Sequence, residues 1–134
     1  MSSKRVVIAL ATADFDPTEA AVPWKVLSDA GHEVLFATAD GQPGACDPLM
    51  LDGGVVFGQI RATDANAAIY REMAATSAFA APIRFADISL EAHDLLILPG
   101  GHAPGMRQYL EDADLQAAVA AFLAADRPLG SICH

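Results

Sequence analysis

The chain has 134 residues, which fits one domain, and 53% of them are hydrophobic, enough to build a core. Its 17 acidic residues outnumber its 8 basic ones and give a net charge of −9, which disfavours nucleic acids and anionic membrane surfaces as partners. No apolar run approaches the roughly 20 residues that span a bilayer. The sequence contains two distant cysteines, Cys46 and Cys133, and we expect no disulfide and a reducing, cytoplasmic setting.

The first third of the sequence predicts a strand, a helix and a second strand. Residues 5–11 are a continuous apolar run, typical of a strand that is buried on both faces. Asp16 and Pro17 begin a helix as N-cap and first helical residue, and the helix runs to Ala30 with Gly31 just after it. Residues 33–38 predict the next strand, which completes a right-handed βαβ unit. We expect one helix face to carry Glu19 and to bury Val22, Pro23, Val26, Leu27 and Ala30.

The middle of the chain has weaker signals. Residues 39–54 are rich in Gly, Pro and Asp, which predicts a loop, and this loop carries Cys46. Residues 64–76 predict a helix capped by Thr63 or Asp64, with Ala68, Ile69, Met73 and Ala74 as its apolar positions. Residues 79–93 show no clear period, and we expect them to cross the surface and to contribute a lid.

The last third again alternates strand and helix. Residues 95–98 predict a strand that ends in Pro99-Gly100-Gly101-His102. Asp112 caps a helix that runs to about Asp126, and a strand follows from Leu129. We expect the buried stripe of this helix to consist of Leu115, Val119, Phe122 and Leu123. The alternation predicts an α/β sandwich with a mainly parallel sheet.

Two strand ends carry residues suited to chemistry. Cys133 follows an apolar run, as a nucleophile does at a sharp turn between a strand and a helix. Gly100 and Gly101 follow the other strand, and backbone amides without side chains can approach a ligand closely there. Strands that end side by side suggest one pocket at their carboxyl ends. Two plainer interpretations stay open, an inert buried Cys133 and a Glu19 that only caps its own helix.

These motifs resemble a known family. The strand with Pro-Gly-Gly at 95–101, the turn Ser131-Ile132-Cys133-His134, and Glu19 in Glu19-Ala20-Ala21-Val22-Pro23 look like the ThiJ/PfpI group of the class I glutamine-amidotransferase-like superfamily. The resemblance implies a flavodoxin-like three-layer sandwich with a mainly parallel sheet, incomplete after the turn at Cys133. Residues 1–134 are then expected to be the N-terminal part of a single domain.

The resemblance also implies roles for individual residues. Cys133 would be the nucleophile, Glu19 would hydrogen-bond to it, and His134 could serve as the base. The amides of Gly101 and His134 would form an oxyanion site, and Gly100, Gly101 and His102 would line the substrate pocket. From the fold we expect the side chains of Glu19 and Cys133 to touch, although they lie far apart in sequence. The Glu19 carboxyl should then keep its proton, because two negative charges repel at that range.

The leading functional hypothesis is an enzyme of the glyoxalase III type, which converts a 2-oxoaldehyde to a hydroxy acid by thiolate addition. A cysteine amidase or peptidase of the PfpI type is the first alternative. A redox-sensing or chaperone protein with an oxidisable cysteine is the second. No cofactor and no metal are expected, since no zinc-site spacing occurs. The resemblance implies a homodimer or a higher homo-oligomer.

Overall fold

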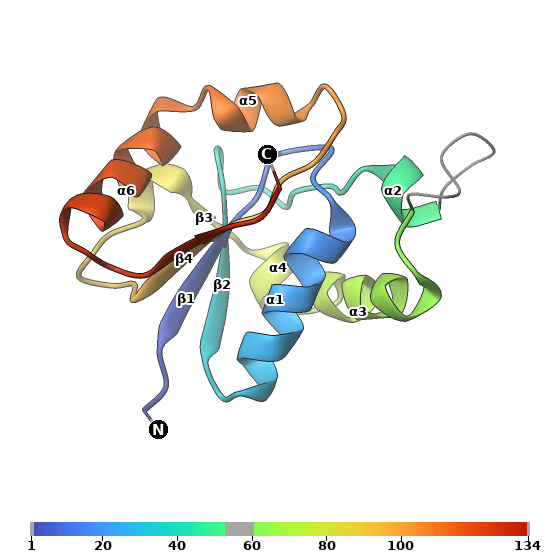
Figure 1. Cartoon of the computed structure of the whole chain (residues 1–134), viewed down its shortest axis with the longest axis horizontal. Coiled ribbons are helices and arrows are strands. Elements are labelled where there is room, and N and C mark those ends of the chain that lie inside the picture. The colour runs from blue at the N-terminus through green and yellow to red at the C-terminus, as the bar shows by residue number, and fades with distance from the viewer. Residues whose placement is uncertain (1, 53–60, 134) are drawn as a thin grey trace.

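A parallel β-sheet forms the centre of the structure, a computed structural model that describes residues 2–52 and 61–133. Among these residues the sheet has five strands in the order β3-β2-β1-β4-β5, and each neighbouring pair is parallel. In that order the strands are Ile83–Arg84, Glu33–Thr38, Arg5–Ala9, Leu95–Leu98 and Leu129–Ser131. The predicted flavodoxin-like sandwich with a mainly parallel sheet is therefore confirmed (Figure 1).

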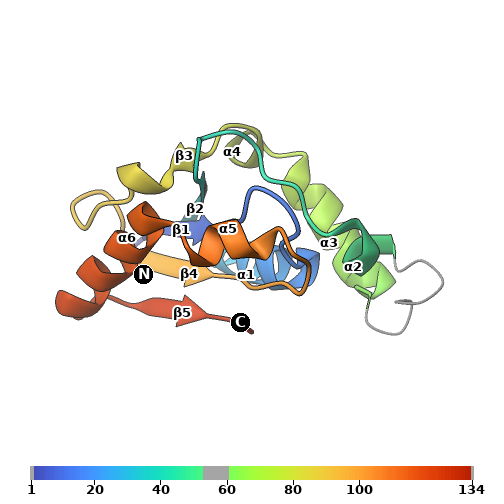
Figure 2. The same cartoon turned by 90° about the horizontal axis from the view of Figure 1, so that it is seen from above.

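Helices lie on both faces of the sheet. In Figures 1 and 2, α1 (Pro17–Asp29), α3 (Asp64–Ala74) and α4 (Ser77–Ala80) lie on one side, and α6 (Ala113–Ala124) lies on the other with the 3-10 turn η1 (Phe85–Asp87). The short helix α5 (Met106–Leu110) lies over the carboxyl end of the sheet, and α2 (Pro48–Asp52) packs beside α3. No helix of the described residues is long and apolar enough to cross a membrane.

The start and end of α1 follow from its capping residues. The Asp16 carboxylate accepts hydrogen bonds from the backbone N–H groups of Thr18 and Glu19, and Pro17 occupies the first helical position. Gly31 lies just beyond the C-cap with φ of 91°, a conformation that favours glycine. The predicted bounds of this helix are therefore confirmed to within a residue.

The predicted buried faces of two helices are wrong in part. In α1 the buried residues are Pro17, Ala20, Ala21 and Trp24, whereas Val26 is 61% exposed. In α6 the residues Leu115, Ala118 and Phe122 are buried and Leu123 is 64% exposed. Alanine carries little hydrophobic signal in a sequence, yet it lets a helix approach a sheet closely, so the buried stripes are rotated toward the alanines.

The middle of the chain contains more structure than its sequence predicts. Helix α2 lies inside the predicted loop 39–54, of which residues 53 and 54 are outside the described part. The stretch 79–93 contributes the edge strand β3, and Phe79 and Phe85 anchor it in the core. The expectation of a lid is wrong, because β3 forms the edge of the sheet opposite to β5, the strand before Cys133.

The core lies mainly around β1 and β2. Four consecutive residues of β1, Val6–Ala9, are fully buried, as expected for a central parallel strand. The rings of Phe15, Phe36, Tyr70 and Phe79 pack at tilted or edge-on angles beside these strands. Strand β5, by contrast, is half-buried to exposed, because it lies at the edge of the sheet.

Candidate active site

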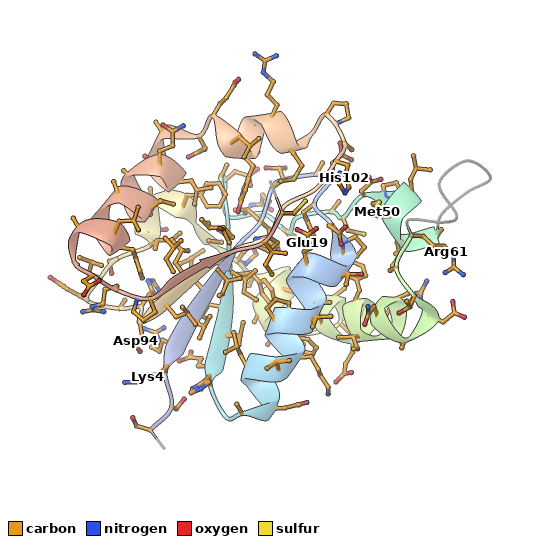
Figure 3. All side chains as sticks on the ribbon, viewed as in Figure 1. Lys4, Glu19, Met50, Arg61, Asp94 and His102 are labelled. Carbon is orange, nitrogen blue, oxygen red and sulfur yellow. The ribbon has the colours of Figure 1, made fainter. Side chains whose placement is uncertain are left out.

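Three segments meet at the carboxyl end of the sheet: the first turn of α1, the loop 99–105 after β4, and the residues after β5. The order β1-β4-β5 places their ends side by side, as the general rule for parallel sheets predicts. Figure 3 shows Glu19 and His102 at this end of the molecule and Lys4 and Asp94 at the other end. The structure therefore places the predicted site residues that it describes at the carboxyl end of the sheet.

Cys133 lies just beyond the edge of the sheet. The Ile132 N–H still donates to the Leu98 carbonyl at 3.0 Å, so the chain follows β4 for one residue after β5 ends. Cys133 then takes φ of 66°, a left-handed conformation that is uncommon for a residue with a side chain, and it is exposed. This strained turn presents a reactive side chain to a substrate in other enzymes.

Glu19 joins the first turn of α1 to both other segments. Its Oε1 accepts a hydrogen bond from the Gly100 N–H at 2.8 Å, and its side chain is in hydrogen-bond contact with that of Cys133. The expected contact between Glu19 and Cys133 is therefore present. The plainer role of a capping box is not observed, because the Asp16 N–H donates to the Gly100 carbonyl instead of to Glu19.

The environment of Glu19 favours its protonated form. Burial of the half-exposed side chain raises the pKa of the Glu19 carboxyl, and the Asp16 carboxylate adds to the rise. The hydrogen bond from Gly100, the contact with Cys133 and the nearby His102 imidazole offset part of this effect, but the pKa stays above its ordinary value. The direction agrees with the expectation that this carboxyl holds a proton more readily than an exposed glutamate does.

The loop 99–105 packs tightly against the segment that precedes α1. Gly100 and Gly101 are both buried. A Cβ atom at position 101 would lie 2.6 Å from the Asp14 carbonyl oxygen and 2.9 Å from Cγ of Met106, so only glycine fits there. A pocket of about 540 Å³ opens along this loop, with Gly101, His102 and Arg107 among its lining residues. His102 is exposed at this pocket and close enough to Glu19 to act on its charge.

The other predicted residues stand apart from this cluster. His134 lies outside the described residues, so its expected role as base and its amide as oxyanion donor stay predictions. Cys46 is half-buried, its thiol is in hydrogen-bond contact with Tyr70, and burial raises the pKa of the thiol. Within residues 2–52 and 61–133, no cluster of three or more His, Cys, Asp or Glu side chains could hold a metal ion.

Sequence reasoning missed one residue of this region, Asp14. Its backbone has φ of 72°, and its Oδ2 accepts a hydrogen bond from the Gly105 N–H at 2.8 Å. Asp tolerates the left-handed conformation better than most residues with a side chain, since its short carboxylate can bond to nearby backbone. The stretch Ala13-Asp14-Phe15-Asp16-Pro17 between a strand and a helix could have pointed to such a turn.

Fold and site together define an α/β protein with a cysteine at a strained strand end, a carboxyl beside it, and a glycine loop next to both. Residues 10–134 match the sequence profile described as ThiJ/PfpI family-like, and the chain belongs to this family. An uncharacterized protein of Schizosaccharomyces pombe is 31% identical over 121 residues, which are 89% of this chain and 45% of that protein. This chain thus spans about half the length of that relative.

Solved structures show the same fold. A ThiJ/PfpI domain protein from Brachyspira murdochii superposes with a TM-score of 0.66 at 12% identity, covering 98% of this chain and 59% of that one. A glyoxalase III from Candida albicans superposes with a TM-score of 0.65 at 17% identity, covering 98% and 57%. A DJ-1 superfamily protein from Agrobacterium tumefaciens gives 0.59 at 24% identity, covering 97% and 53%. At these identities the likeness concerns the fold.

Proposed function

We propose that this protein is a cofactor-independent cysteine enzyme that converts small 2-oxoaldehydes to 2-hydroxy acids, as a glyoxalase III does. The observation that carries the proposal is the contact between the Glu19 carboxyl and Cys133, at a turn where Cys133 is exposed and its backbone is left-handed. A carboxyl with a raised pKa beside a cysteine can move a proton to and from a bound substrate. The fold shared with the Candida albicans glyoxalase III is consistent with the proposal.

The reaction begins with attack of the Cys133 thiolate on the aldehyde carbon. A C–S bond forms, the electron pair of the C=O bond moves to oxygen, and the Gly101 N–H stabilises the oxyanion before it is protonated to a hemithioacetal. A base, Glu19 or His134, then removes the hydrogen of that carbon as a proton, and the neighbouring carbonyl carbon receives a proton. The result is a thioester of a 2-hydroxy acid, with no net oxidation. Water hydrolyses the thioester and releases the acid and the thiol.

Glu19 is suited to the proton transfer by its two oxygens. Oε1 accepts from the Gly100 N–H, which fixes the carboxyl group, so a proton is best carried by Oε2. Because burial raises the pKa of Glu19, the group exchanges a proton closer to neutral pH than an exposed glutamate would. His102 lines the pocket along the loop 99–105 and is proposed to contact the substrate.

The experiment is to incubate the natural protein with methylglyoxal and to follow lactate by NMR in D₂O. We expect lactate with deuterium at the carbon that receives the proton, and loss of more than about 100-fold of turnover in Cys133→Ser, because the thiolate is the nucleophile. Cys46→Ser is the matched control and should keep wild-type turnover. Absence of lactate would refute the proposal. Release of ammonia from amides would then favour the amidase alternative, and peroxide oxidation of Cys133 without any turnover would favour the redox alternative.

The proposal extends to setting and assembly. The excess of acidic residues and the absence of a membrane-spanning helix among the described residues are compatible with a cytoplasmic enzyme that needs no nucleic acid or membrane partner. The assembly proposed is a homodimer or a larger homo-oligomer, which light scattering on the purified protein would test. A monomer at micromolar concentration would contradict this part.

A further inference from the structure

The peptide between Gly100 and Gly101 is reversed relative to a regular strand. The Leu98 carbonyl points toward β5, where it accepts the Ile132 N–H at 3.0 Å. In a continuing strand the Gly100 carbonyl would point the same way, since orientation repeats every second residue. It points to the other side instead and accepts the Asp16 N–H at 2.8 Å. Because this peptide bond is trans, the Gly101 N–H points opposite to that carbonyl and therefore away from Asp16.

The reversal is held from both sides of Gly100. Its carbonyl accepts from Asp16, and its N–H donates to Oε1 of Glu19 at 2.8 Å. These two contacts fix the first half of the loop to the first turn of α1. These contacts do not involve residues 101–105, the second half of the loop. The orientation of the Gly101 N–H therefore also depends on the groups that hold this second half.

Asp14 makes the contacts to this second half. Its carbonyl oxygen packs against Gly101, where a Cβ atom would come within 2.6 Å of it. Its Oδ2 accepts the Gly105 N–H at 2.8 Å, and a Cβ atom on Gly105 would lie 2.5 Å from that oxygen. One half-buried residue thus touches both ends of the segment 101–105. It reaches both because its backbone is left-handed, with φ of 72°.

We propose that Asp14 is a positioning residue that holds the loop 101–105 so that the Gly101 N–H faces the substrate oxygen at Cys133. The inference rests on the proposed function for the role of that N–H, and on the contacts above for the role of Asp14. Asp14 touches neither Cys133 nor the reacting atoms in this scheme. It acts through Gly101 and Gly105, and it should affect steps that develop an oxyanion and leave other reactions of the thiolate unchanged.

Three variants separate the hydrogen bond from the backbone. Asp14→Gly allows the left-handed backbone and removes the acceptor of the Gly105 N–H. Asp14→Asn keeps an acceptor oxygen and tolerates the same backbone, so it serves as the conservative rescue. Gly105→Ala keeps Asp14 but disrupts the same hydrogen bond from the side of residue 105. The new Cβ atom there would overlap Oδ2 of Asp14 and displace the carboxylate. Circular dichroism checks that each variant folds, and Gly105→Ala tests the same contact if Asp14→Gly does not fold.

Two reactions of the same thiol are then compared. With methylglyoxal we expect Asp14→Gly and Gly105→Ala to lower kcat by about 10–100-fold with little change in KM, since a small displacement of an oxyanion donor has effects of this size. Asp14→Asn should recover most of kcat. Alkylation of Cys133 by iodoacetamide should stay within about twofold of wild type in all three, because displacement of iodide develops no oxyanion. Wild-type kcat in Asp14→Gly, or an equal loss in alkylation and turnover, would overturn the proposal.

A second readout does not depend on the reaction. Hydrogen exchange at the amides of residues 101–105 should be at least about 10-fold faster in Asp14→Gly than in wild type, and Asp14→Asn should restore protection, because the Gly105 amide loses or keeps its acceptor. If the wild-type protein does not convert methylglyoxal but exchange responds in this way, the proposed function fails and the positioning by Asp14 stands. Unchanged exchange in Asp14→Gly would overturn the positioning whatever the activity.

Discussion

The contact between Glu19 and the loop 99–105 gives a stability prediction that two substitutions at one position can test. In Glu19→Ala the buried Gly100 N–H loses the acceptor that now lies 2.8 Å away. A buried donor without a partner costs about 1–3 kcal/mol, and Cys133 loses its contact as well. For a chain of 134 residues each kcal/mol lowers Tm by about 3–4 °C, so we expect a decrease of about 3–12 °C.

Glu19→Gln is the matched control. Its side-chain oxygen can accept the same hydrogen bond from Gly100, so its Tm at pH 7 should stay within about 3 °C of wild type. Thermal unfolding followed by circular dichroism at pH 7 measures both variants. If Glu19→Ala unfolds at the same temperature as Glu19→Gln, the carboxyl does not hold the loop, and the argument from the Gly100 hydrogen bond is refuted.

The pH dependence of these variants has a defined sign. Burial raises the pKa of Glu19 in the folded state, so the folded protein binds this proton more tightly than the unfolded chain does. The resulting stability is complete below the ordinary Glu value of 4.5 and is lost as the pH rises through the folded pKa. Glu19→Gln lacks this pH-dependent contribution to stability, because its side chain does not titrate. Its stability relative to wild type should therefore increase as the pH rises above about 4.5, and a decrease would contradict the raised pKa.

Three further outcomes are expected. Iodoacetamide at pH 7 should label Cys133 before Cys46, because Cys133 is exposed whereas burial raises the pKa of the Cys46 thiol; peptide mapping that finds Cys46 labelled first would contradict the site. Gly101→Ala should lower kcat for methylglyoxal at least about 10-fold, because its Cβ atom cannot stay 2.6 Å from the Asp14 carbonyl; wild-type kcat would refute the tight packing. Tyr109→Phe should unfold at the same or a higher temperature, because the Tyr109 hydroxyl is buried with no hydrogen-bond partner among residues 2–52 and 61–133; a loss above about 1 kcal/mol in urea unfolding would show a partner.

The sequence was most informative where one local rule decides the structure. Asp16, Pro17 and Gly31 carry the chemistry of helix ends, and they located α1 to within a residue. The parallel arrangement followed from alternating apolar runs, and it placed the ends of β1, β4 and β5 together. The contact between Glu19 and Cys133 was expected from the family resemblance together with that topology.

The features that sequence reasoning missed depend on packing. Helices α2 and α5 have five residues each, too few to form without tertiary contacts, so their sequences carry little helical signal. The buried face of α1 follows Ala20, Ala21 and Trp24, where surface fit decides more than hydrophobicity does. The roles of Asp14 and of the reversed peptide at Gly100 require a partner segment about 90 residues away, which no local pattern indicates.

At Cys133 the residue that would be best for stability differs from the residue that the proposed chemistry needs, because the backbone there is left-handed. A residue with a side chain at φ of 66° costs about 1 kcal/mol or more relative to glycine, which adopts this conformation without strain. Cys133→Gly would thus remove the proposed nucleophile and relieve the turn at the same time. Selection for a tolerant, easily folded sequence would favour glycine here, and selection for a reactive thiol favours the strained cysteine that the chain carries.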